Sequence, residues 1–401
     1  MNRNIAPKVS VVIPSYNHGE FIGKAIDSVL AQTFTDFEII IVDDASTDDS
    51  SEKIKCYKDR RIKFYKLEKN LGAVFTLNYC IKNTCGKYIA LLNSDDMWEP
   101  EKLEIQVDFL DRNSHIGAVF TNATFIGEDG RVLEKSDFFW VDAFEKENLS
   151  SGKWLRRLFF ELNCLCHPSI LIRKEVYDRT KLYNPCFRQL PDYYMWIEIL
   201  KFTSIFVIAK KLVKFRILSS VENTSAVTVE NRIRNINEIF LIIKNYFKDI
   251  PSDIFVEGFS DLFKKKGELS KEEVLCEQAF MFFQVNSEID YIYRLVGIEK
   301  LFILMQNRNT NFVLKNSYNF DDKEFFKLTG NEYNGVNNNQ TLCEEIEKMY
   351  DQLVVEHETC NEKLLRFENS VEYKIGILFR KVFWFFYYKA RKTSAKWNFK
   401  N

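Results

Sequence analysis

The sequence predicts an α/β protein, with a parallel β-sheet covered by helices on both sides in its first half and a mostly helical C-terminal region. Over the first 120 residues, short apolar runs typical of strands alternate with segments whose apolar residues recur at helical spacing. The strand candidates are apolar on both faces, which is typical of a parallel sheet buried between two layers of helices. With 401 residues, 46% of them hydrophobic, the chain is long enough for two domains.

The alternation is regular from residue 9 to residue 121. The first strand candidate ends at Pro14, and the apolar residues of the segment 21–32 that follows it fall on one helix face. The second strand candidate, EIIIVDD at 38–44, leads into the sequence STD at 46–48, whose side chains favour a helix N-terminus. The remaining candidates are strands at 61–67, 88–92 and 116–121, and helices at 70–83 and after Pro100.

Beyond residue 122 the alternation loosens, and from about residue 230 the chain is predicted to be mostly helical. The Asn-rich polar segment 304–340 is predicted to be a loop or linker. Between residues 122 and 230 we expect a hairpin turn at 127–132, helices at 151–162 and 192–202, and strands at 169–174 and 204–210. We therefore divide the chain into an α/β domain at 1–230, a helical accessory region at 231–335, a short coiled-coil segment at 336–370 and a basic aromatic amphipathic tail at 371–401.

The coiled-coil segment rests on a heptad pattern in residues 342–367. Two heptad positions are occupied as follows: Ile346, Leu353, Cys360 and Phe367 share one, and Leu342, Met349, Glu356 and Lys363 share the other. Two of these eight residues are charged, so the apolar seam is good only in its first half. A coiled coil would make a homo-oligomer, and the alternative is one amphipathic helix packed on its own domain.

The tail combines bases with a dense apolar block. Residues 374–401 contain eight Lys and Arg and no acid, although the whole chain has a net charge of −1. Seven apolar residues, five of them Phe or Tyr, occupy 382–388 between these bases. This composition favours a segment that lies on an anionic membrane surface, and a helix docked on the protein is the alternative. A nucleic-acid partner is not expected, because the bases flank an apolar block instead of following a groove.

Composition predicts a cytoplasmic chain, attached at most to the inner face of the cytoplasmic membrane through this tail. The N-terminal sequence MNRNIAPKVS lacks the apolar run of a secretory signal. The nine cysteines are odd in number and irregular in spacing, as expected of reduced cytosolic thiols. No stretch reaches the ~20 apolar residues that a membrane-spanning helix needs.

Two acidic pairs follow predicted strands directly. Asp43 and Asp44 end the run EIIIV, and Asp95 and Asp96 follow YIALLNS. Ligands of open α/β sheets bind at the carboxyl ends of the strands, and we expect the two strands to be neighbours there. Clustered carboxylates repel one another unless a cation or a hydrogen-bond donor balances them. Hard oxygen ligands select Mg²⁺ or Mn²⁺ held together with substrate phosphates. Neither a P-loop nor a Gly-x-Gly-x-x-Gly motif is present, so the phosphorylated ligand is not expected to bind in either of those ways.

The sequence resembles the family 2 glycosyltransferases of the GT-A fold, a Rossmann-like nucleotide-diphospho-sugar transferase domain. The resemblance covers residues 7–215 and rests on four segments in order: VSVVIPSYNHGEFIGKAIDSVLAQTFTDFEIIIVDDASTDDS, NLG at 70–72, GKYIALLNSDDMWEPEKL and LPDYYMWIEIL. It implies an inverting transfer of one sugar from a nucleotide-diphospho-sugar, with a UDP-sugar favoured. The implied acceptor is a glycan or a lipid-linked oligosaccharide, in the synthesis of a bacterial surface polysaccharide.

The resemblance also implies roles for single residues on the donor side. Pro14, Tyr16 and Asn17 match the loop that holds the nucleotide base, and Tyr16 offers a stacking face. Asp44, with Asp43 beside it, matches the acid that contacts the base. Asn93, Ser94, Asp95 and Asp96 match the Asp-x-Asp region, in which Asp95 would face the ribose or the metal and Asp96 would ligate Mn²⁺ or Mg²⁺. The first acid of that motif is replaced by Asn93, an amide that is a weaker metal ligand.

On the acceptor side, Asp192 matches the catalytic base of the family. It stands in the first turn of the predicted helix after Pro191, and Trp196 lies one turn further on the same face. A first-turn acid that interacts only with the helix dipole is the alternative for Asp192. Trp196 is either an acceptor platform or a core residue, and His167 either faces the acceptor or is a core histidine.

A different class of function stays open at this stage. The chain would be a catalytically inactive scaffold or binding protein of a polysaccharide assembly complex, and Asn93 gives this reading slight support. The presence of Asp44, Asp95, Asp96 and Asp192 argues against it, since a scaffold does not need these carboxylates. A nucleotidyltransferase is disfavoured because PSYNHGEF lacks the glycine-rich basic loop that such an enzyme uses.

Overall fold

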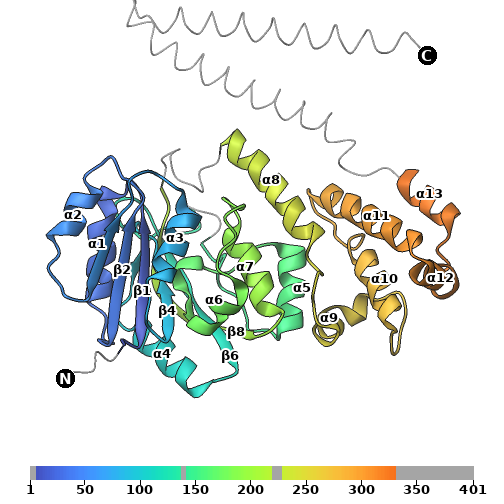
Figure 1. Cartoon of the computed structure of the whole chain (residues 1–401), viewed down its shortest axis with the longest axis horizontal. Helices are drawn as coiled ribbons and strands as arrows, with labels where there is room; N and C mark the ends of the chain where they lie inside the picture. Colours follow the sequence, from blue (N-terminus) through green and yellow to red (C-terminus); the bar gives the residue numbers. More distant parts are fainter. Residues whose placement is uncertain (1–5, 137–140, 219–227, 331–401) are drawn as a thin grey trace, which may run out of the picture. The chain divides into compact units, whose positions relative to one another are not determined.

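One eight-stranded sheet organises the N-terminal half of the chain in the computed structural model, which describes residues 6–136, 141–218 and 228–330 (Figure 1). The strand order is β3-β2-β1-β4-β7-β6-β8-β5. The strands are β1 (Val9–Ser15), β2 (Phe37–Asp43), β3 (Ile62–Lys66), β4 (Tyr88–Leu91), β5 (Met97–Trp98), β6 (Ile116–Ile126), β7 (Leu171–Arg173) and β8 (Ser204–Arg216).

The sheet is mixed, which corrects the prediction of a purely parallel one. Strand β1 pairs in parallel with β2 and β4, and β2 with β3, as predicted. Strand β7 runs antiparallel to both β4 and β6, and β5 runs antiparallel to β8. These two strands are three and two residues long. An apolar run indicates burial on both faces but carries no information on strand direction, so the reversal was not visible in the sequence.

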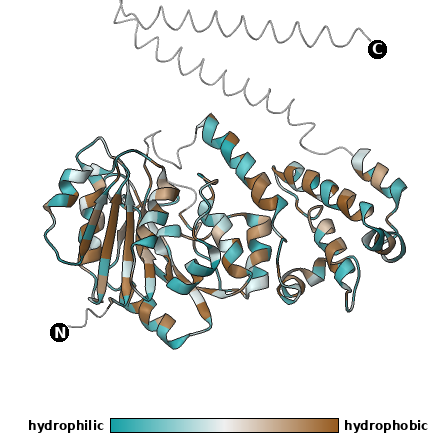
Figure 2. Cartoon of the chain, in the orientation of Figure 1, coloured by the Kyte–Doolittle hydropathy of each residue, from teal (hydrophilic) through white to brown (hydrophobic). Residues whose placement is uncertain are grey.

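Helices cover both faces of the sheet (Figure 1). Alternate residues of β1 point to opposite faces, so Val11 packs into one core cluster and Val12 into the other. Figure 2 shows that β1 and β2 are almost entirely hydrophobic, in keeping with burial on both sides. One face carries α1 (Gly19–Leu30), α2 (Ser50–Cys56) and α4 (Lys102–Arg112), and the other carries α3 (Ala73–Lys82), α5 (Ser151–Glu161), α6 (Lys174–Thr180) and α7 (Pro191–Leu200).

The turn predicted at 127–132 is confirmed. The amide of Gly127 donates to the carbonyl of Arg131 at 2.8 Å, and an isolated antiparallel bridge joins Ile126 and Val132. Gly130 has a φ of +87°, which a residue with a side chain rarely adopts.

The region after residue 228 is helical, as predicted, and shares the core of the sheet domain. Phe159 of α5 is ringed by aromatic side chains of this region, with ring centroids 5.0 to 5.9 Å away. The described residues, which end at Gly330, all belong to one compact unit. The helices are α8 (Val229–Lys244), α9 (Ser252–Phe259), α10 (Lys271–Met281), α11 (Asp290–Gln306), α12 (Arg308–Ser317) and α13 (Asp322–Gly330).

The loop predicted at 304–340 is wrong over most of its described part, because α12 and α13 occupy it. Asn307 caps α12 by accepting hydrogen bonds from the amides of Asn309 and Thr310. Leu314 is fully buried in a small core cluster with Phe280 of α10. Only a narrow apolar stripe anchors these helices, so their polar composition hid them.

Two sequence predictions fall outside the described residues, namely the coiled-coil segment at 336–370 and the basic tail at 371–401. Within the described ranges, no helix combines the length and the apolar character needed to cross a membrane.

Candidate active site

The residues predicted for the donor side lie at one edge of the sheet. The carboxyl ends of β1, β2 and β4 lie there because the three strands are parallel. Strand β8 is parallel to β6, which has the same direction as β4, so Arg216 at its end reaches the same edge. Strand β7 is reversed, so the short 3-10 helix before it (His167–Ser169) also arrives there. The two acidic pairs do not follow neighbouring strands, because β1 lies between β2 and β4.

The side chain of Asp43 is hydrogen-bonded to the segment that follows it. Its side chain is fully buried, and its Oδ2 accepts hydrogen bonds from the Ser46 amide at 3.2 Å and the Ser51 hydroxyl at 2.6 Å. The Ser46 hydroxyl also donates to its Oδ1. These bonds shape the connection between β2 and α2, so Asp43 has a structural role, and its contact with a nucleotide stays a prediction.

Asp44 fixes the second loop of the edge, which contains the sequence NLG. Its Oδ1 accepts from the Leu71 amide at 2.7 Å and its Oδ2 from the Gly72 amide at 2.8 Å. Gly72 has a φ of +91° directly before α3, so this turn favours glycine. Each oxygen of Asp44 keeps a further lone pair, so the carboxylate can still accept a hydrogen bond from a ligand.

The loop after β1 carries the residues expected to hold a base. Tyr16 is 43% exposed, so one face of its ring is free to stack. Asn17 has a φ of +50°, and its Oδ1 accepts from the Thr47 amide at 2.9 Å. The backbone amide of Asn17 donates to the Ser46 hydroxyl at 2.9 Å. Asn17 therefore ties this loop to the one after β2, and Pro14, half-buried in β1, precedes it.

Asp95 and Asp96 lie together at the end of β4 in different surroundings. Both oxygens of Asp96 are engaged: Asn93 Nδ2 donates to Oδ2 at 2.9 Å, and the Arg216 amide donates to Oδ1 at 2.7 Å. The Arg216 guanidinium also donates to the Asp95 carbonyl at 2.8 Å. On the other side, the His18 ring nitrogen Nδ1 lies 4.0 Å from Asp95 Oδ1 and 2.7 Å from the Ser94 hydroxyl.

Burial raises the pKa of both carboxyls. For Asp96 the neighbouring charge of Asp95 raises the pKa further, whereas for Asp95 the charges of His18 and Arg216 act in the opposite direction. Two acids with raised pKa values and hard oxygen donors fit a divalent cation that is completed by phosphate oxygens. Within the part of the chain that the structure describes, no group of three or more His, Cys, Asp or Glu is arranged to hold a metal by itself.

Asp192 lies in the first turn of α7, as predicted. Asn163 Nδ2 donates to its Oδ2 at 2.7 Å, and the amide of Tyr193 donates to its Oδ1 at 2.8 Å. Close by, His167 Nε2 is hydrogen-bonded to the Tyr183 hydroxyl at 2.9 Å. Burial lowers the pKa of His167, and the charge of Asp192 acts in the opposite direction, which places the two side chains within electrostatic reach.

Trp196 is a core residue, which is the second of the two alternatives given for it. Its side chain is fully buried in the main core cluster. The indole ring packs against Phe120 at 4.9 Å and against His167 at 5.6 Å between centroids. The position of Trp196, one turn after Asp192, therefore serves packing, because α7 turns inward at Trp196 while Asp192 in its first turn stays partly exposed.

Three residues of this edge were missed in the sequence. Arg216 carried a weak signal, since it is a basic residue at the end of a strand. His18 stands beside the predicted Asn17, and Asn163 lies in a short connection after α5. Each acts on a predicted residue through a long-range contact, and local patterns do not report such contacts.

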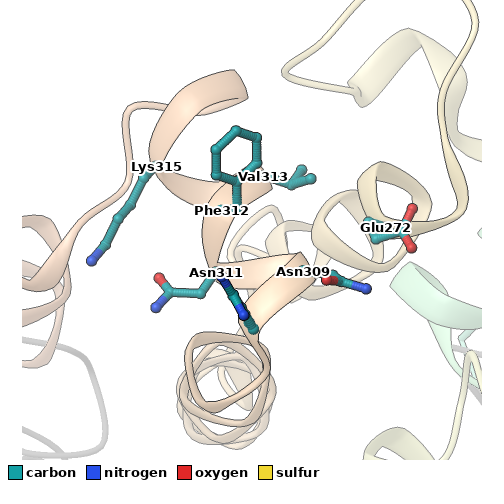
Figure 3. Close-up of a pocket in the computed structure, with 7 residues that line it drawn as sticks. Glu272, Asn309, Asn311, Phe312, Val313 and Lys315 are labelled. Atoms are coloured by element: carbon teal, nitrogen blue, oxygen red, sulfur yellow. The ribbon is translucent and has the colours of Figure 1, made fainter.

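A separate surface pocket of about 570 Å³ lies in the helical region, far along the chain from the edge (Figure 3). Glu272 of α10 and residues of α12 line it, including Arg308, Asn309, Phe312 and Lys315. None of the predicted site residues contributes to it. Its lining lacks paired carboxylates, so the strand edge is the better candidate for metal and phosphate chemistry.

The fold and the acid-lined edge define a glycosyltransferase domain of the GT-A type. A family model described as glycosyl transferase family 2 matches residues 10–180. The putative teichuronic acid biosynthesis glycosyltransferase TuaG of Bacillus subtilis is 34% identical over 200 residues, which cover 49% of this chain and 74% of TuaG. The chain therefore belongs to family 2 of the glycosyltransferases.

Two further comparisons show how far the similarity to known proteins extends. An uncharacterized glycosyltransferase of Rickettsia felis is 37% identical over 215 residues, which cover 52% of this chain and 33% of that protein. The chain spans about a third of the length of several curated relatives that it matches. A crystal structure of S. aureus TarS 1–349 in complex with UDP-GlcNAc has 20% identity and a TM-score of 0.50, with 78% of this chain and 91% of that chain covered. At this identity the likeness concerns the fold.

Proposed function

We propose that this chain transfers one sugar from a nucleotide-diphospho-sugar to a hydroxyl of a glycan or lipid-linked acceptor, with inversion at the anomeric carbon. The observation that carries the proposal is the pair Asp95 and Asp96 at the carboxyl end of β4, with Asp192 within electrostatic reach of His167 at the same edge of the sheet. A carboxylate in a first turn also has a structural explanation in the helix dipole. The side-chain amide of Asn163 donates a hydrogen bond to one oxygen of Asp192 and so fixes the orientation of the carboxylate. A favourable interaction with the helix dipole would not require a fixed orientation.

On the donor side, the base stacks on Tyr16, whose ring is partly exposed, and the Asp44 carboxylate accepts a hydrogen bond from its edge. Asp95 and Asp96 would hold Mn²⁺ or Mg²⁺ together with the diphosphate. When bound, such a cation offsets the negative charge that develops on the leaving nucleoside diphosphate. Arg216 keeps Asp96 oriented through its backbone amide, and Asn93 does so through its side chain.

On the acceptor side, Asp192 removes the proton of the attacking hydroxyl as its oxygen bonds to the anomeric carbon. The bond from that carbon to the diphosphate oxygen breaks in the same step, and the electron pair leaves with the diphosphate. One displacement from the far face inverts the centre, so no covalent sugar–enzyme intermediate is needed. Holding both substrates in line supplies much of the rate.

UDP-sugars are the favoured donors, and a surface polysaccharide is the favoured product. The family resemblance favours UDP, and the TarS structure of the same fold is a complex with UDP-GlcNAc. TuaG is named for teichuronic acid biosynthesis, which supports a cell-surface glycan as the product.

The proposal is tested by donor turnover. The purified chain is incubated with UDP-, GDP- and dTDP-sugars plus Mn²⁺, with and without bacterial lipid-linked glycan extract, and the released nucleoside diphosphate is measured. We expect release from one donor, lost by a factor of 10²–10⁴ in Asp192→Asn. Asp253→Asn is the matched control, because Asp253 is also the second residue of its helix, α9, and is exposed there.

Equal losses in Asp192→Asn and Asp253→Asn would contradict the role of Asp192 as the base. If no nucleotide binds in the presence of Mn²⁺ and no donor turns over, the chain is the scaffold of an assembly complex. Binding of UDP is therefore measured calorimetrically on the same samples.

We also propose that the chain acts in the cytoplasm at the inner membrane face, held there by residues 371–401. The argument is the composition of this segment, with eight bases and no acid in residues 374–401. Vesicles containing about a third anionic lipid should bind the full chain and not a chain that ends at residue 370. Equal binding by both would contradict this role of the tail.

A further inference from the structure

A buried carboxylate of the helical region holds the loop that leads to Asp192. Glu238 of α8 is 4% exposed, and both of its oxygens point at backbone amides of residues 188–190. The Arg188 amide donates to Oε1 at 2.8 Å, and the amides of Gln189 and Leu190 both donate to Oε2 at 2.9 Å. A buried ionised carboxylate needs such donors, and three of them make a strong arrangement.

These amides stand directly before α7, in which Asp192 is the second residue. Leu190 occupies the N-cap position, and its own side chain cannot satisfy the free amides of a helix N-terminus. Glu238 accepts from the N-cap amide of Leu190 and from the two amides before it, and it places a negative charge where the helix dipole favours one. The position of the first turn of α7 therefore depends on α8.

The same loop is also held at its other end. Asn78 of α3 forms two hydrogen bonds with the backbone of Tyr183, one from its Nδ2 at 2.7 Å and one to its Oδ1 at 3.0 Å. Close to the Glu238 contacts, Gln189 Nε2 donates to Asn231 Oδ1 at 3.0 Å, so α8 contacts the loop at two points. The segment 183–190 is thus clamped between the sheet domain and α8.

We infer that Glu238 is a positioning residue for sugar transfer, which sets the place of the Asp192 carboxylate through the loop 188–190. The inference rests on the proposed function of Asp192 as the base. It assigns the helical region a part in the transfer step, because α8 belongs to that region. A general base must lie within hydrogen-bond reach of the proton it removes, and a displacement of about 1 Å can cost on the order of 100-fold in rate.

The test compares two buried glutamates of the same kind. In Glu238→Gln the side-chain NH₂ faces backbone N–H donors, so at least one of the three hydrogen bonds is lost. The matched control is Glu277→Gln, since fully buried Glu277 of α10 accepts from the amides of Lys264 and Lys265 at 3.0 and 2.8 Å in a loop remote in sequence from α7. Both variants lose stability, and only the first loosens the loop before Asp192.

Three readouts are taken for the full chain and both variants: turnover with the donor found in the panel, binding of UDP with Mn²⁺, and amide hydrogen exchange at residues 188–190. For Glu238→Gln we expect kcat to fall by about 10- to 100-fold. UDP affinity should change less than about twofold, since the loop does not touch the donor residues. The amides of 188–190 should exchange at least tenfold faster, and Glu277→Gln should leave kcat and these amides within about twofold of wild type.

Each contrary outcome has a definite meaning. Unchanged protection of 188–190 in Glu238→Gln, or faster exchange with an unchanged kcat, would overturn the positioning role. If kcat falls equally in both variants, a general loss of stability explains the fall, and the positioning role of Glu238 is also overturned. A wild-type chain that turns over no donor would instead defeat the proposed function, and the inference with it.

Discussion

The side-chain amide of Asn163 lies 2.7 Å from a carboxylate oxygen of Asp192, across 29 residues of sequence. Asn163 follows Leu162, whose φ of +61° and ψ of −154° are rare for any residue except glycine. The backbone is therefore strained directly beside the polar contact of the proposed base. Strain of this kind is retained where the surrounding structure holds it, and functional sites are common places for it.

Replacing Asn163 by Ala should slow transfer more than it weakens donor binding. The variant loses the side-chain amide that donates to Asp192 Oδ2, so we expect kcat to fall about tenfold, with UDP affinity within about twofold of wild type. Steady-state turnover and calorimetry check the two values. Asn245→Ala is the control, because Asn245 also donates a side-chain amide hydrogen bond, to Leu241, at the end of α8. A kcat loss of similar size in the control would remove the role of Asn163.

Replacing Ala45 by Gly should stabilise the chain. Ala45 lies between Asp44 and Ser46 with a φ of +60°, a conformation that costs Ala more than Gly. Gly is also more flexible than Ala in the unfolded chain, which offsets part of this gain. We therefore expect the free energy of unfolding to increase by about 1 kcal/mol or less. Urea titration checks it, with Ala25→Gly in α1 as the comparison that should lose stability. A lower midpoint for Ala45→Gly would contradict the strain at this position.

Glu38 should make stability depend on pH below about 4.5. Burial acts to raise the pKa of Glu38, but hydrogen bonds from Cys85, Lys63 and Ser10 outweigh it and lower the pKa from 4.5 to about 2. Since the pKa is lower in the folded chain, the stabilisation is complete above the unfolded value. It is lost as the pH falls from about 4.5 toward 2, and amounts to on the order of 3 kcal/mol.

The measurement is the free energy of unfolding between pH 6 and pH 3, for wild type and Glu38→Gln. The variant should be less stable at pH 6, and the difference should shrink as the pH falls. Glu99→Gln is the control, because Glu99 pairs with Lys214 while half-exposed. A constant difference between wild type and Glu38→Gln across this range would refute the assignment.

Asp96→Asn should abolish the thermal shift that a divalent cation and UDP produce together. In wild type the Asp95 and Asp96 carboxylates repel one another in buried surroundings, and a cation with bound diphosphate relieves this repulsion. We expect wild type to melt several degrees higher with Mn²⁺ and UDP, and to lose the gain with EDTA. The variant loses the repulsion from Asp95, but it also loses one of the two hydrogen bonds that Asp96 accepts from Asn93 and Arg216. Its melting temperature without cation should therefore stay within a few degrees of wild type, and it should gain little with cation. Asp108→Asn, an exposed acid of α4, should respond as wild type does.

Much of this architecture could be predicted from local patterns. The apolar runs of β1, β2 and β4 and the spacing of α1 and α7 follow from burial alone, which acts on each segment separately. The acidic pairs and Asp192 could be recognised because motifs for phosphate and metal chemistry keep their residues close in sequence. The polar helices α12 and α13 could not, since only a few apolar residues such as Leu314 anchor them.

Long-range pairing accounts for the rest. The reversal of β7 brings His167 to the edge, and β1 separates the two acidic pairs, although neither strand direction nor strand order is encoded in apolar periodicity. Arg216 reaches Asp96 across 120 residues, and Glu238 reaches Leu190 across 48. Such contacts depend on how distant segments pack, so their residues look like an ordinary strand end and an ordinary helix acid in the sequence. The residue types of the candidate site could be predicted from the sequence. Their hydrogen-bond partners and their orientation depend on how distant segments pack in the folded protein.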